Sequence, residues 1–197
     1  NQATYFPQTS TPGLTWYRVT VIDLGSGCGD PVSNAILITV FAQPTVTISI
    51  DTPVICVGGV GIITSQVTNG SGIFTYQWQQ SDDGSIWTDI TTNGTSPTYT
   101  VPSNIASSRY YKLILTDHTL DCEDPESDAV QVDVVTPVIL TVTAQDDTVC
   151  VGAITIINSS ISGGSGFFTY QWQQSPNGTS SWTNVSSNGN NPSYTVP

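Results

Sequence analysis

The residues of this chain that could perform acid–base or nucleophilic chemistry are few. Its 197 residues include one histidine, His118, together with 15 carboxylates and four cysteines. General acid–base catalysis needs titratable groups within hydrogen-bond reach of one another, and no set of acid, base and nucleophile clusters or recurs in the sequence. The carboxylates of Asp82 and Asp83 precede Gly84 in a predicted turn, where solvation and turn geometry account for them. We therefore expect no enzymatic activity.

The cysteines are more typical of an oxidising extracellular environment than of a cytosol. None of them belongs to a Cys-x-x-Cys pair of the kind that binds zinc or exchanges disulfides. We treat all four as candidates for disulfide bonds. They are Cys28, Cys56, Cys122 and Cys150.

A segment rich in carboxylates, residues 117–126, offers oxygen ligands for a cation. Its candidate calcium ligands are Asp117, Asp121 and Asp124, because calcium prefers carboxylate oxygens. Their spacing differs from that of an EF-hand. Calcium is the one metal that the sequence suggests, and we expect no other cofactor.

The charge of the chain excludes two classes of partner. Three cations stand against 15 carboxylates and give a net charge of −12, which opposes binding to nucleic acid and to anionic membranes. No apolar run reaches the length of a membrane span, and the first residues lack the pattern of an export signal. We expect neither a nucleic-acid partner nor insertion into a membrane.

An internal repeat organises the whole sequence. The hexapeptide Tyr-Gln-Trp-Gln-Gln-Ser at residues 76–81 returns at residues 170–175, 94 positions later. Other segments match at the same spacing, the last of them after a one-residue insertion: 56–58 with 150–152, 28–31 with 122–125, and 99–102 with 194–197.

The repeat predicts one complete unit and two half-units. Residues 43–136 form the complete unit, residues 1–42 the C-terminal half of an earlier unit, and residues 137–197 the N-terminal half of a later one. Half a sandwich leaves an apolar face in water. We therefore expect flanking sequence or partner chains to complete each half.

Short runs of β-branched and aromatic residues, separated by turn residues, predict strands in the complete unit. The pattern is typical of an immunoglobulin-like sandwich of about 100 residues. We expect an all-β fold of tandem immunoglobulin-like β-sandwich domains arranged head to tail, with no helix of any length. The predicted strands are 45–50, 61–68, 74–80, 86–90, 97–101, 109–116 and 129–135.

Alternation along residues 74–80 places the aromatic side chains on one face and the glutamines on the other. Trp78 is therefore the expected anchor of the core. The other expected core residues are Tyr76, Tyr99, Tyr111, Tyr170 and Trp172. The alternative is that the repeated rings form a surface on which sugar rings stack.

The order of motifs resembles the immunoglobulin-like repeats of giant cell-surface proteins in Bacteroidota. The motifs are Tyr-Gln-Trp-Gln-Gln-Ser, an Asp-Gly or Asn-Gly turn, Trp-Thr, Thr-Tyr-Thr-Val-Pro, Tyr-Tyr-Lys and a cysteine. Such repeats are similar to those of gliding-motility adhesins exported by the type IX secretion route. The resemblance implies an extracellular protein at the cell surface, whose arrays carry binding tips away from the cell.

The sequence departs from immunoglobulin domains of the vertebrate type at the usual core disulfide. The corresponding places hold Ile63 or its neighbours and Lys112-Leu113, so packing around Trp78 must hold the two sheets together.

The pairing of the cysteines stays open between three alternatives. An immunoglobulin-like topology puts Cys56 and Cys122 at opposite ends of a domain, about 25 Å apart, whereas the Cα atoms of a disulfide approach within about 7 Å. Cys56 could bond to the downstream equivalent of Cys122 across a domain junction. It could instead bond to Cys122 in a distorted domain, or the thiols could be free or join different chains.

Two functions fit these features. Strict periodicity favours a mechanical spacer or filament shaft of a long adhesin. The alternative is direct binding of carbohydrate or another surface ligand by the faces of the repeats. The expected partners are neighbouring repeats, other copies in a filament, and surface glycans.

Overall fold

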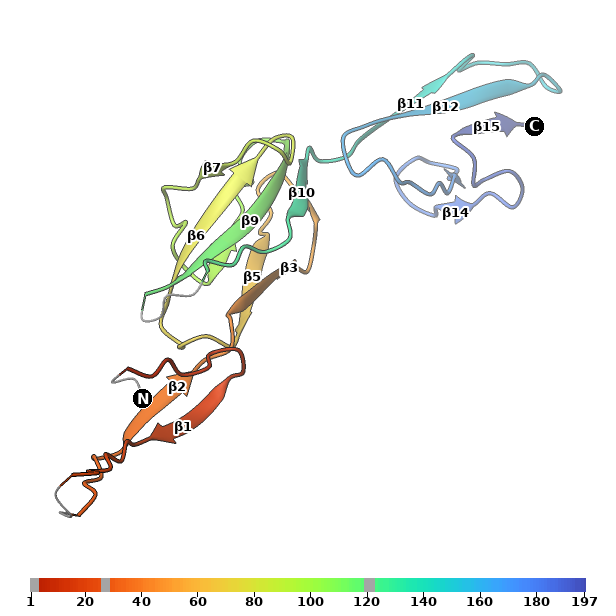
Figure 1. Ribbon diagram of the computed structural model, residues 1–197. Helices are drawn as coiled ribbons and strands as arrows, with labels where there is room; N and C mark the ends of the chain where they lie inside the picture. The colour runs from red at the N-terminus through yellow and green to blue at the C-terminus, as the bar shows by residue number, and fades with distance from the viewer. Residues whose placement is uncertain (1–3, 26–28, 119–122) are drawn as a thin grey trace. The chain divides into compact units, whose positions relative to one another are not determined.

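The computed structural model of the protein describes residues 4–25, 29–118 and 123–197. Within these residues the chain consists of strands and connections without a helix, as Figure 1 shows, which confirms the all-β prediction. The described part therefore has no helix of the length and hydropathy that a membrane span requires. The abundance of Val, Ile, Thr and aromatic residues explains the strands, because these side chains fit a pleated surface.

The chain divides into two compact units. Strand β9 (Ser107–Asp117) and strand β10 (Val130–Val135) each contribute residues to both units. The first unit comprises Asn1–Ile50, Ile62–Thr100 and Tyr110–Val130, and the second comprises Asp51–Gly61, Val101–Arg109 and Gln131–Pro197.

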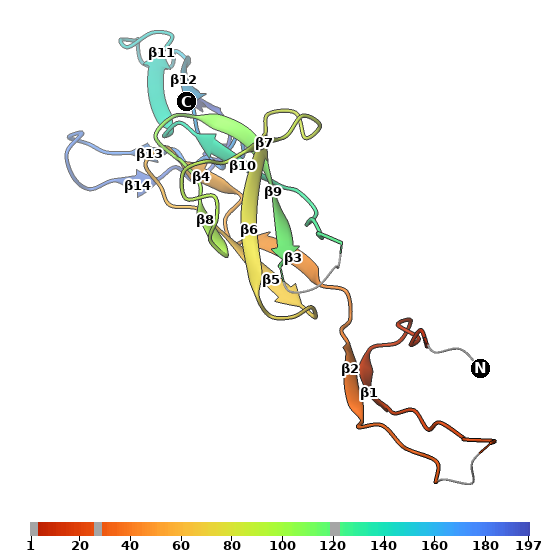
Figure 2. The ribbon, with the colours of Figure 1, turned by 60° about the vertical axis from the view of Figure 1, so that its left-hand side comes forward.

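The first unit begins with a two-stranded hairpin. Strand β1 (Gly13–Tyr17) pairs antiparallel with β2 (Ile36–Val40), and a bridge between Thr20 and Val32 continues the pairing beyond β1. Figure 2 shows this hairpin in red and orange.

A three-stranded sheet follows, in the order β3-β5-β8. Strands β3 (Thr45–Ile50) and β5 (Ile62–Thr68) are antiparallel, and β8 (Thr98–Thr100) pairs with the other edge of β5. The hydroxyls of Thr45 and Thr68 lie 2.6 Å apart at the first pair of the β3–β5 ladder.

The other sheet of the complete repeat has the order β4-β10-β9-β6-β7. Strands β6 and β9 form an antiparallel ladder from Phe74–Asp117 to Ser81–Tyr110, and β4 and β10 pair in parallel. The strands are β4 (Val54–Cys56), β6 (Phe74–Ser81), β7 (Thr88–Asp89), β9 (Ser107–Asp117) and β10 (Val130–Val135).

This strand order is that of an immunoglobulin-like sandwich. In the nomenclature of that fold, β3-β5-β8 corresponds to A-B-E and β10-β9-β6-β7 to G-F-C-C′. The two sheets of the first unit face each other through Trp78, Tyr99 and Tyr111. The rings of Trp78 and Tyr99 lie 5.9 Å apart, and those of Tyr99 and Tyr111 lie 5.6 Å apart. The β-sandwich prediction is therefore confirmed.

The second unit ends in a partial copy of the same architecture. Its sheet β11-β12-β15 reproduces the order and register of β3-β5-β8, and the short pair β13-β14 reproduces β6-β7. The strands are β11 (Ile139–Ala144), β12 (Thr155–Ser162), β13 (Gln173–Gln174), β14 (Thr183–Asn184) and β15 (Ser193–Val196).

Apolar side chains from alternate strand positions form the buried core of each unit. Ile63 and Leu113, at the places of the vertebrate core disulfide, are fully buried. The buried apolar residues of the first unit are Val46, Ile63, Trp78, Ile90, Tyr99, Tyr111, Leu113 and Leu115, and those of the second are Ile55, Val101, Val132 and Val134.

Two local predictions were wrong. The predicted strand at 86–90 is reduced to β7, because the Asp83 carboxylate accepts hydrogen bonds from the backbone N–H groups of Ser85 and Ile86 and holds them in a turn. Cys56, expected in a connection, is the last residue of β4, a strand that the sequence did not reveal.

Candidate functional site

Three hydrogen bonds fix the position of Trp78 in the first unit. Its indole N–H donates to the carbonyl oxygen of Ser96 at 2.8 Å, and its backbone N–H donates to that of Gly94 at 2.8 Å. The backbone N–H of Ile90 donates to the Trp78 carbonyl at 2.9 Å. Residues 90–96, the Trp cradle, thus bind both the backbone and the ring of Trp78.

The Trp cradle was not predicted from the sequence. Its signal is the Asn-Gly pair at residues 93–94, repeated at 188–189. Asn93 adopts a φ of 57°, and a Cβ on Gly94 would overlap the carbonyl oxygen of Ile90. Glycine occupies position 94 because there is no room there for a side chain.

The expected core residues of the complete repeat do not lie equally deep. Trp78, Tyr99 and Tyr111 are buried, with Trp78 0% exposed. Tyr76 is half-buried, although it shares a face of β6 with Trp78. This difference shows that alternation fixes the face of a side chain, while the surrounding strands fix its depth.

The copy of this site in the second unit keeps the hydrogen bonds and loses the burial. The indole N–H of Trp172 donates to the Asn191 carbonyl at 2.8 Å, and its backbone N–H donates to Gly189 at 2.7 Å. Yet Trp172 and Tyr170 are only half-buried. The core position expected for Trp172 and Tyr170 stays a prediction, because residues 137–197 contain no counterparts of β9 and β10.

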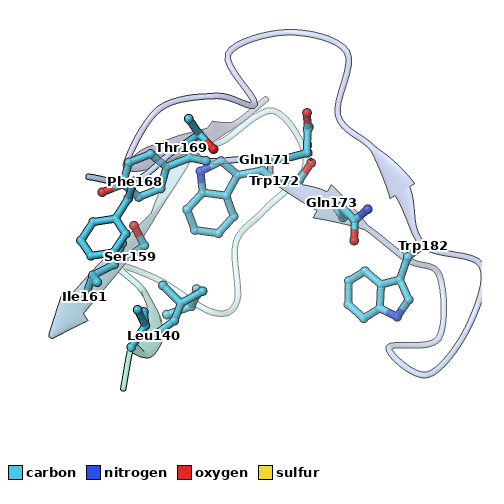
Figure 3. Close-up of a pocket in the computed structure, with 12 residues that line it drawn as sticks. Leu140, Ser159, Ile161, Phe168, Thr169, Gln171, Trp172, Gln173 and Trp182 are labelled. Atoms are coloured by element: carbon cyan, nitrogen blue, oxygen red, sulfur yellow. Dashed lines mark hydrogen bonds between the residues drawn. The ribbon is translucent and has the colours of Figure 1, made fainter. Parts of the chain in front are cut away.

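An apolar groove of about 570 Å³ therefore lies open on residues 137–197. Figure 3 shows Phe168, Trp172 and Leu140 gathered on one side of it, with Trp182 apart from them on the β14 side. The lining residues lie in β11 and β12, in the segment 168–173 that leads into β13, and at Trp182 just before β14. Exposed apolar side chains, among them Leu140 and Trp182, line this groove.

The candidate calcium ligands are only partly described. Asp121 lies outside the described residues, and Asp124 is exposed and accepts a hydrogen bond from Thr116 at 3.1 Å. Asp117 is buried, and its carboxylate accepts bonds from the backbone N–H of Ser71 at 2.8 Å and from the Ser71 hydroxyl at 2.6 Å.

These bonds give Asp117 a structural role in holding the turn between β5 and β6. Among the described residues, no three His, Cys, Asp or Glu side chains gather in a metal-binding group. Calcium binding stays a prediction, which thermal unfolding with and without a chelator tests.

Lys112 bridges two features of the complete repeat. Its ammonium nitrogen lies 2.6 Å from a carboxylate oxygen of Glu126 and 4.8 Å from the ring centre of Trp87. The half-buried Trp87 is thus covered by a cation on the outer side of the β6–β9 sheet.

The cysteines are described in part. Cys56 and Cys150 are exposed free thiols, while Cys28 and Cys122 lie outside the described residues. Cys56 is level with Val135, the last residue of β10. The alternatives for disulfide pairing stay predictions, which non-reducing peptide mapping decides.

His118 is exposed, and its Nε2 atom lies 2.9 Å from the Thr75 hydroxyl. In the part of the chain that the structure describes, every buried side-chain nitrogen or oxygen has a hydrogen-bond partner. The described buried polar side chains of the complete repeat thus all take part in hydrogen bonds within the fold.

The acidity of the Asp83 carboxyl is changed by the hydrogen bonds that it accepts. Hydrogen bonds from the backbone N–H groups of Ile86 and Ser85, together with the Ser81 hydroxyl, lower the pKa of this exposed carboxyl below its usual value of 3.8. Asn177 occupies the equivalent turn and accepts the same bonds from Thr179 and Ser180 with its amide oxygen.

We expect Asp83→Asn to remove a pH-dependent contribution to stability while keeping the turn. A carboxyl whose pKa is lowered by folding stabilises the native state above its unfolded pKa, and this contribution is lost as the pH falls through the native pKa. NMR titration of the Asp83 carboxyl carbon should give a midpoint below 3.8. A midpoint at or above that value contradicts the assignment of these hydrogen bonds.

Comparison with known proteins gives a match to a sequence family and to distant solved structures. Residues 45–136 match a family described as a domain of unknown function (DUF8696). No curated protein matches the chain. Three N-terminal domains of the bacteriophage RB49 Highly Immunogenic Outer Capsid protein (Hoc) are 15% identical, with a TM-score of 0.37 over 78% of this chain and 48% of that one. The chain thus spans about half the length of this solved structure.

Proposed function

We propose that the complete repeat, residues 43–136, is a load-bearing spacer in an extracellular array of immunoglobulin-like repeats. The observation that carries this proposal is the parallel pairing of β4 with β10. Strand β4 lies near the beginning of the repeat and β10 at its end, so both strands are close to the points where tension enters and leaves.

Parallel pairing changes how tension acts on the hydrogen bonds. Pulling the N-terminal side of β4 and the C-terminal side of β10 drives the two strands in opposite directions along their own axes. The bonds between them are then loaded together in shear, whereas the bonds of a hairpin pulled at its open ends break one after another. A short parallel pair can therefore resist force out of proportion to its length.

The details of the β4–β10 pair suit this role. The backbone N–H of Asp133 donates to Pro53 and that of Val57 donates to Val135, each at 2.8 Å. The side chains of Ile55 and Val134, which are paired in the ladder, are both buried. Burial excludes water, which would otherwise compete for the β4–β10 hydrogen bonds when they are under tension.

The second candidate, direct binding of sugars, has less support in the complete repeat. Stacking on sugar rings needs exposed aromatic faces, and among the described residues of 43–136 none of the aromatic side chains is exposed. The aromatic side chains that are exposed, such as Trp16 and Trp182, belong to the half-units. A glycan array probed with the full chain should show no binding.

The cellular setting forms part of the proposal. The order of the repeated motifs and the four cysteines favour a surface protein of the Bacteroidota adhesin type, exported by the type IX route. The array would act there as a non-catalytic shaft, with neighbouring repeats as its immediate partners. Its acidic composition keeps such a shaft soluble.

Replacing Val57 by proline should lower the force at which the complete repeat unfolds. Proline removes the N–H that donates to Val135, and with it one bond of the β4–β10 pair. Single-molecule force spectroscopy on the full chain measures this change. In chemical denaturation, the same variant should lose a smaller fraction of its free energy of unfolding than it loses of its unfolding force.

The matched control is Ile90→Ala. It removes a buried side chain next to β7, which lies at the opposite edge of the sheet from β4. It should cost about 2–5 kcal/mol in chemical denaturation and change the unfolding force less than Val57→Pro does. If Val57→Pro leaves the force unchanged while Ile90→Ala lowers it, the β4–β10 pair does not bear the load.

A further inference from the structure

We propose that the free edge of strand β3, in the complete repeat, pairs antiparallel with the same edge of a second copy of this chain. The inference goes beyond the spacer role, because it assigns a lateral partner to the repeat. Only its extension to whole arrays rests on the spacer proposal.

Three of the four sheet edges in the complete repeat are protected against pairing. Within the described residues, the edge strands of its two sheets are β3, β8, β4 and β7. Strand β7 has two residues, one of which is Asp89, and strands β4 and β8 have three residues each. Short edge strands and charged edge residues are means by which proteins keep sheets from pairing.

Strand β3 lacks these protective features. Its six residues, Thr45–Ile50, carry no charge, and neither do the residues of its neighbours β5 and β8. Because the chain has a net charge of −12, two copies repel each other least across an uncharged edge. The counterpart of β3 in the next repeat, β11, is also an uncharged edge strand of six residues. The edge is thus a property of the repeat and not of the ends of the chain.

The hydrogen bonds of β5 show which way its backbone groups point. The Ser65 N–H donates to the Pro97 carbonyl at 3.1 Å, and the Val101 N–H donates to the Gly61 carbonyl at 2.9 Å. Successive residues of a strand direct their backbone groups alternately to its two sides. The odd-numbered residues of β5 therefore bond toward β8, and the even-numbered residues bond toward β3.

This orientation leaves the even-numbered residues of β3 without a partner strand in the described part of the chain. Thr47 is paired with Gln66, so the odd-numbered residues of β3 bond to β5. The N–H and C=O groups of Val46, Ile48 and Ile50 consequently point outward from the edge of the sheet. Such a row of groups is a template for an added strand.

The edge is complementary to itself when Ile48 lies opposite Ile48 of the second copy. A twofold axis at this point pairs Val46 with Ile50, so all the outward-facing residues are used, and it pairs Thr47 with Ser49. Residues opposite each other project to the same face of a sheet. Apolar side chains therefore meet on the inner face, where Val46 is buried and Ile48 and Ile50 are half-buried, and hydroxyls meet on the outer face. A shift by one residue would oppose apolar and polar side chains, so this register is specified.

The molecule already contains the kind of contact expected on the outer face. The hydroxyls of Thr45 and Thr68, which are opposite each other in the β3–β5 ladder, lie 2.6 Å apart. Cross-strand pairs of Thr and Ser stabilise a sheet through such bonds. Pairing of two copies forms the equivalent contact between Thr47 and Ser49 twice.

A single contact of this kind is weak, and an array multiplies it. One pair of six-residue strands covers less surface than a standard protein interface, so single chains should associate only at high concentration. In an array each repeat offers the same edge, and every contact after the first gains from a high effective concentration. Spacer shafts with this edge would bundle side by side.

Amide hydrogen exchange of the 197-residue chain, followed by NMR at a series of concentrations, tests the inference. The outward-facing amides of Val46, Ile48 and Ile50 should exchange more slowly as the concentration rises, by about 10-fold once about nine chains in ten are paired. The amides of Thr47 and Ser49 already bond to β5, so their exchange should change far less. This alternation identifies the strand and the edge that pairs.

Replacing Thr47 by lysine should remove the concentration dependence at the β3 amides. Thr47 is exposed, so the change disturbs no packed group, and the twofold axis brings the two lysines close together. We expect association through this edge to weaken at least about 10-fold. The lysine makes the chain less negative, so greater repulsion between whole chains does not account for such a loss.

The matched control is Thr98→Lys. Thr98 is also exposed and lies on the same face of the same sheet, but in β8 at the opposite edge. In this variant the β3 amides should respond to concentration as they do in the original chain.

The inference is wrong if the exchange of the β3 amides does not depend on concentration. It is also wrong if Thr47 and Ser49 gain as much protection as their neighbours, or if Thr98→Lys suppresses the effect as strongly as Thr47→Lys. Association through another surface gives the first of these results, because it leaves the β3 amides unchanged. The unfolding force of a single repeat does not depend on lateral pairing, so failure of this inference and failure of the spacer proposal are distinguishable.

Discussion

Replacing Trp78 by alanine is expected to lower the free energy of unfolding of the complete repeat by about 3–5 kcal/mol. The ring is fully buried between the two sheets and contacts the ring of Tyr99. Its removal leaves a cavity and deprives the Ser96 carbonyl of its donor. Urea denaturation followed by far-UV circular dichroism measures the change without depending on the fluorescence of the other tryptophans.

The control for this prediction is Trp182→Ala. Trp182 is 51% exposed, so its replacement should change the free energy of unfolding by less than about 0.5 kcal/mol under conditions where the chain is monomeric. Equal losses in the two variants would show that Trp78 is not the anchor of the sandwich.

Replacing Gly94 by alanine is expected to cost about 3 kcal/mol or more. The added Cβ would overlap the carbonyl oxygen of Ile90, and a clash with backbone cannot be relieved by a change of rotamer. Relief would require the Trp cradle to move, which would weaken the hydrogen bond that the Trp78 N–H donates to the Gly94 carbonyl. Thermal unfolding should show a lowered Tm.

Thr95→Ala is the matched control in the same loop, because Thr95 is exposed. Its effect should stay within about 0.5 kcal/mol of zero. A Gly94→Ala variant as stable as Thr95→Ala would mean that residues 90–96 do not hold Trp78 in a fixed position.

Patterns within a single strand were sufficient to predict most strands of the complete repeat. Alternating side chains located β3, β6 and β9 to within a few residues, because one face of each strand is apolar and the other polar. Strand β4 was not predicted, because three residues are too few to show an alternating pattern. Its partner β10 is also distant in the sequence.

The depth of the aromatic side chains could not be predicted from the same patterns. Trp78 and Trp172 lie in identical hexapeptides, and only the first is fully buried. The difference arises from β9 and β10, which cover Trp78 and have no counterpart over Trp172 within the described residues of 137–197. The burial of a side chain depends on neighbouring strands, and these strands lie outside the local sequence.

The Trp cradle illustrates a further limit of sequence reasoning. Its carbonyl oxygens belong to residues without distinctive chemistry, and the Asn-Gly pair at 93–94 indicates a turn rather than a contact with Trp78. The tertiary fold brings this loop to the edge of β6. Comparison of the two copies of the repeat makes the arrangement visible, since Gly189 binds Trp172 in the same way.

Amide hydrogen exchange at the two identical hexapeptides tests the account most directly. The intrinsic exchange rates of the two segments are the same, so a difference between them reports structure alone. In the dilute chain, the amides of Gln77 and Gln79, which are paired with β9, should exchange far more slowly than those of Gln171 and Gln173. Equal protection of both copies would contradict the view that one repeat is complete and the other lies open.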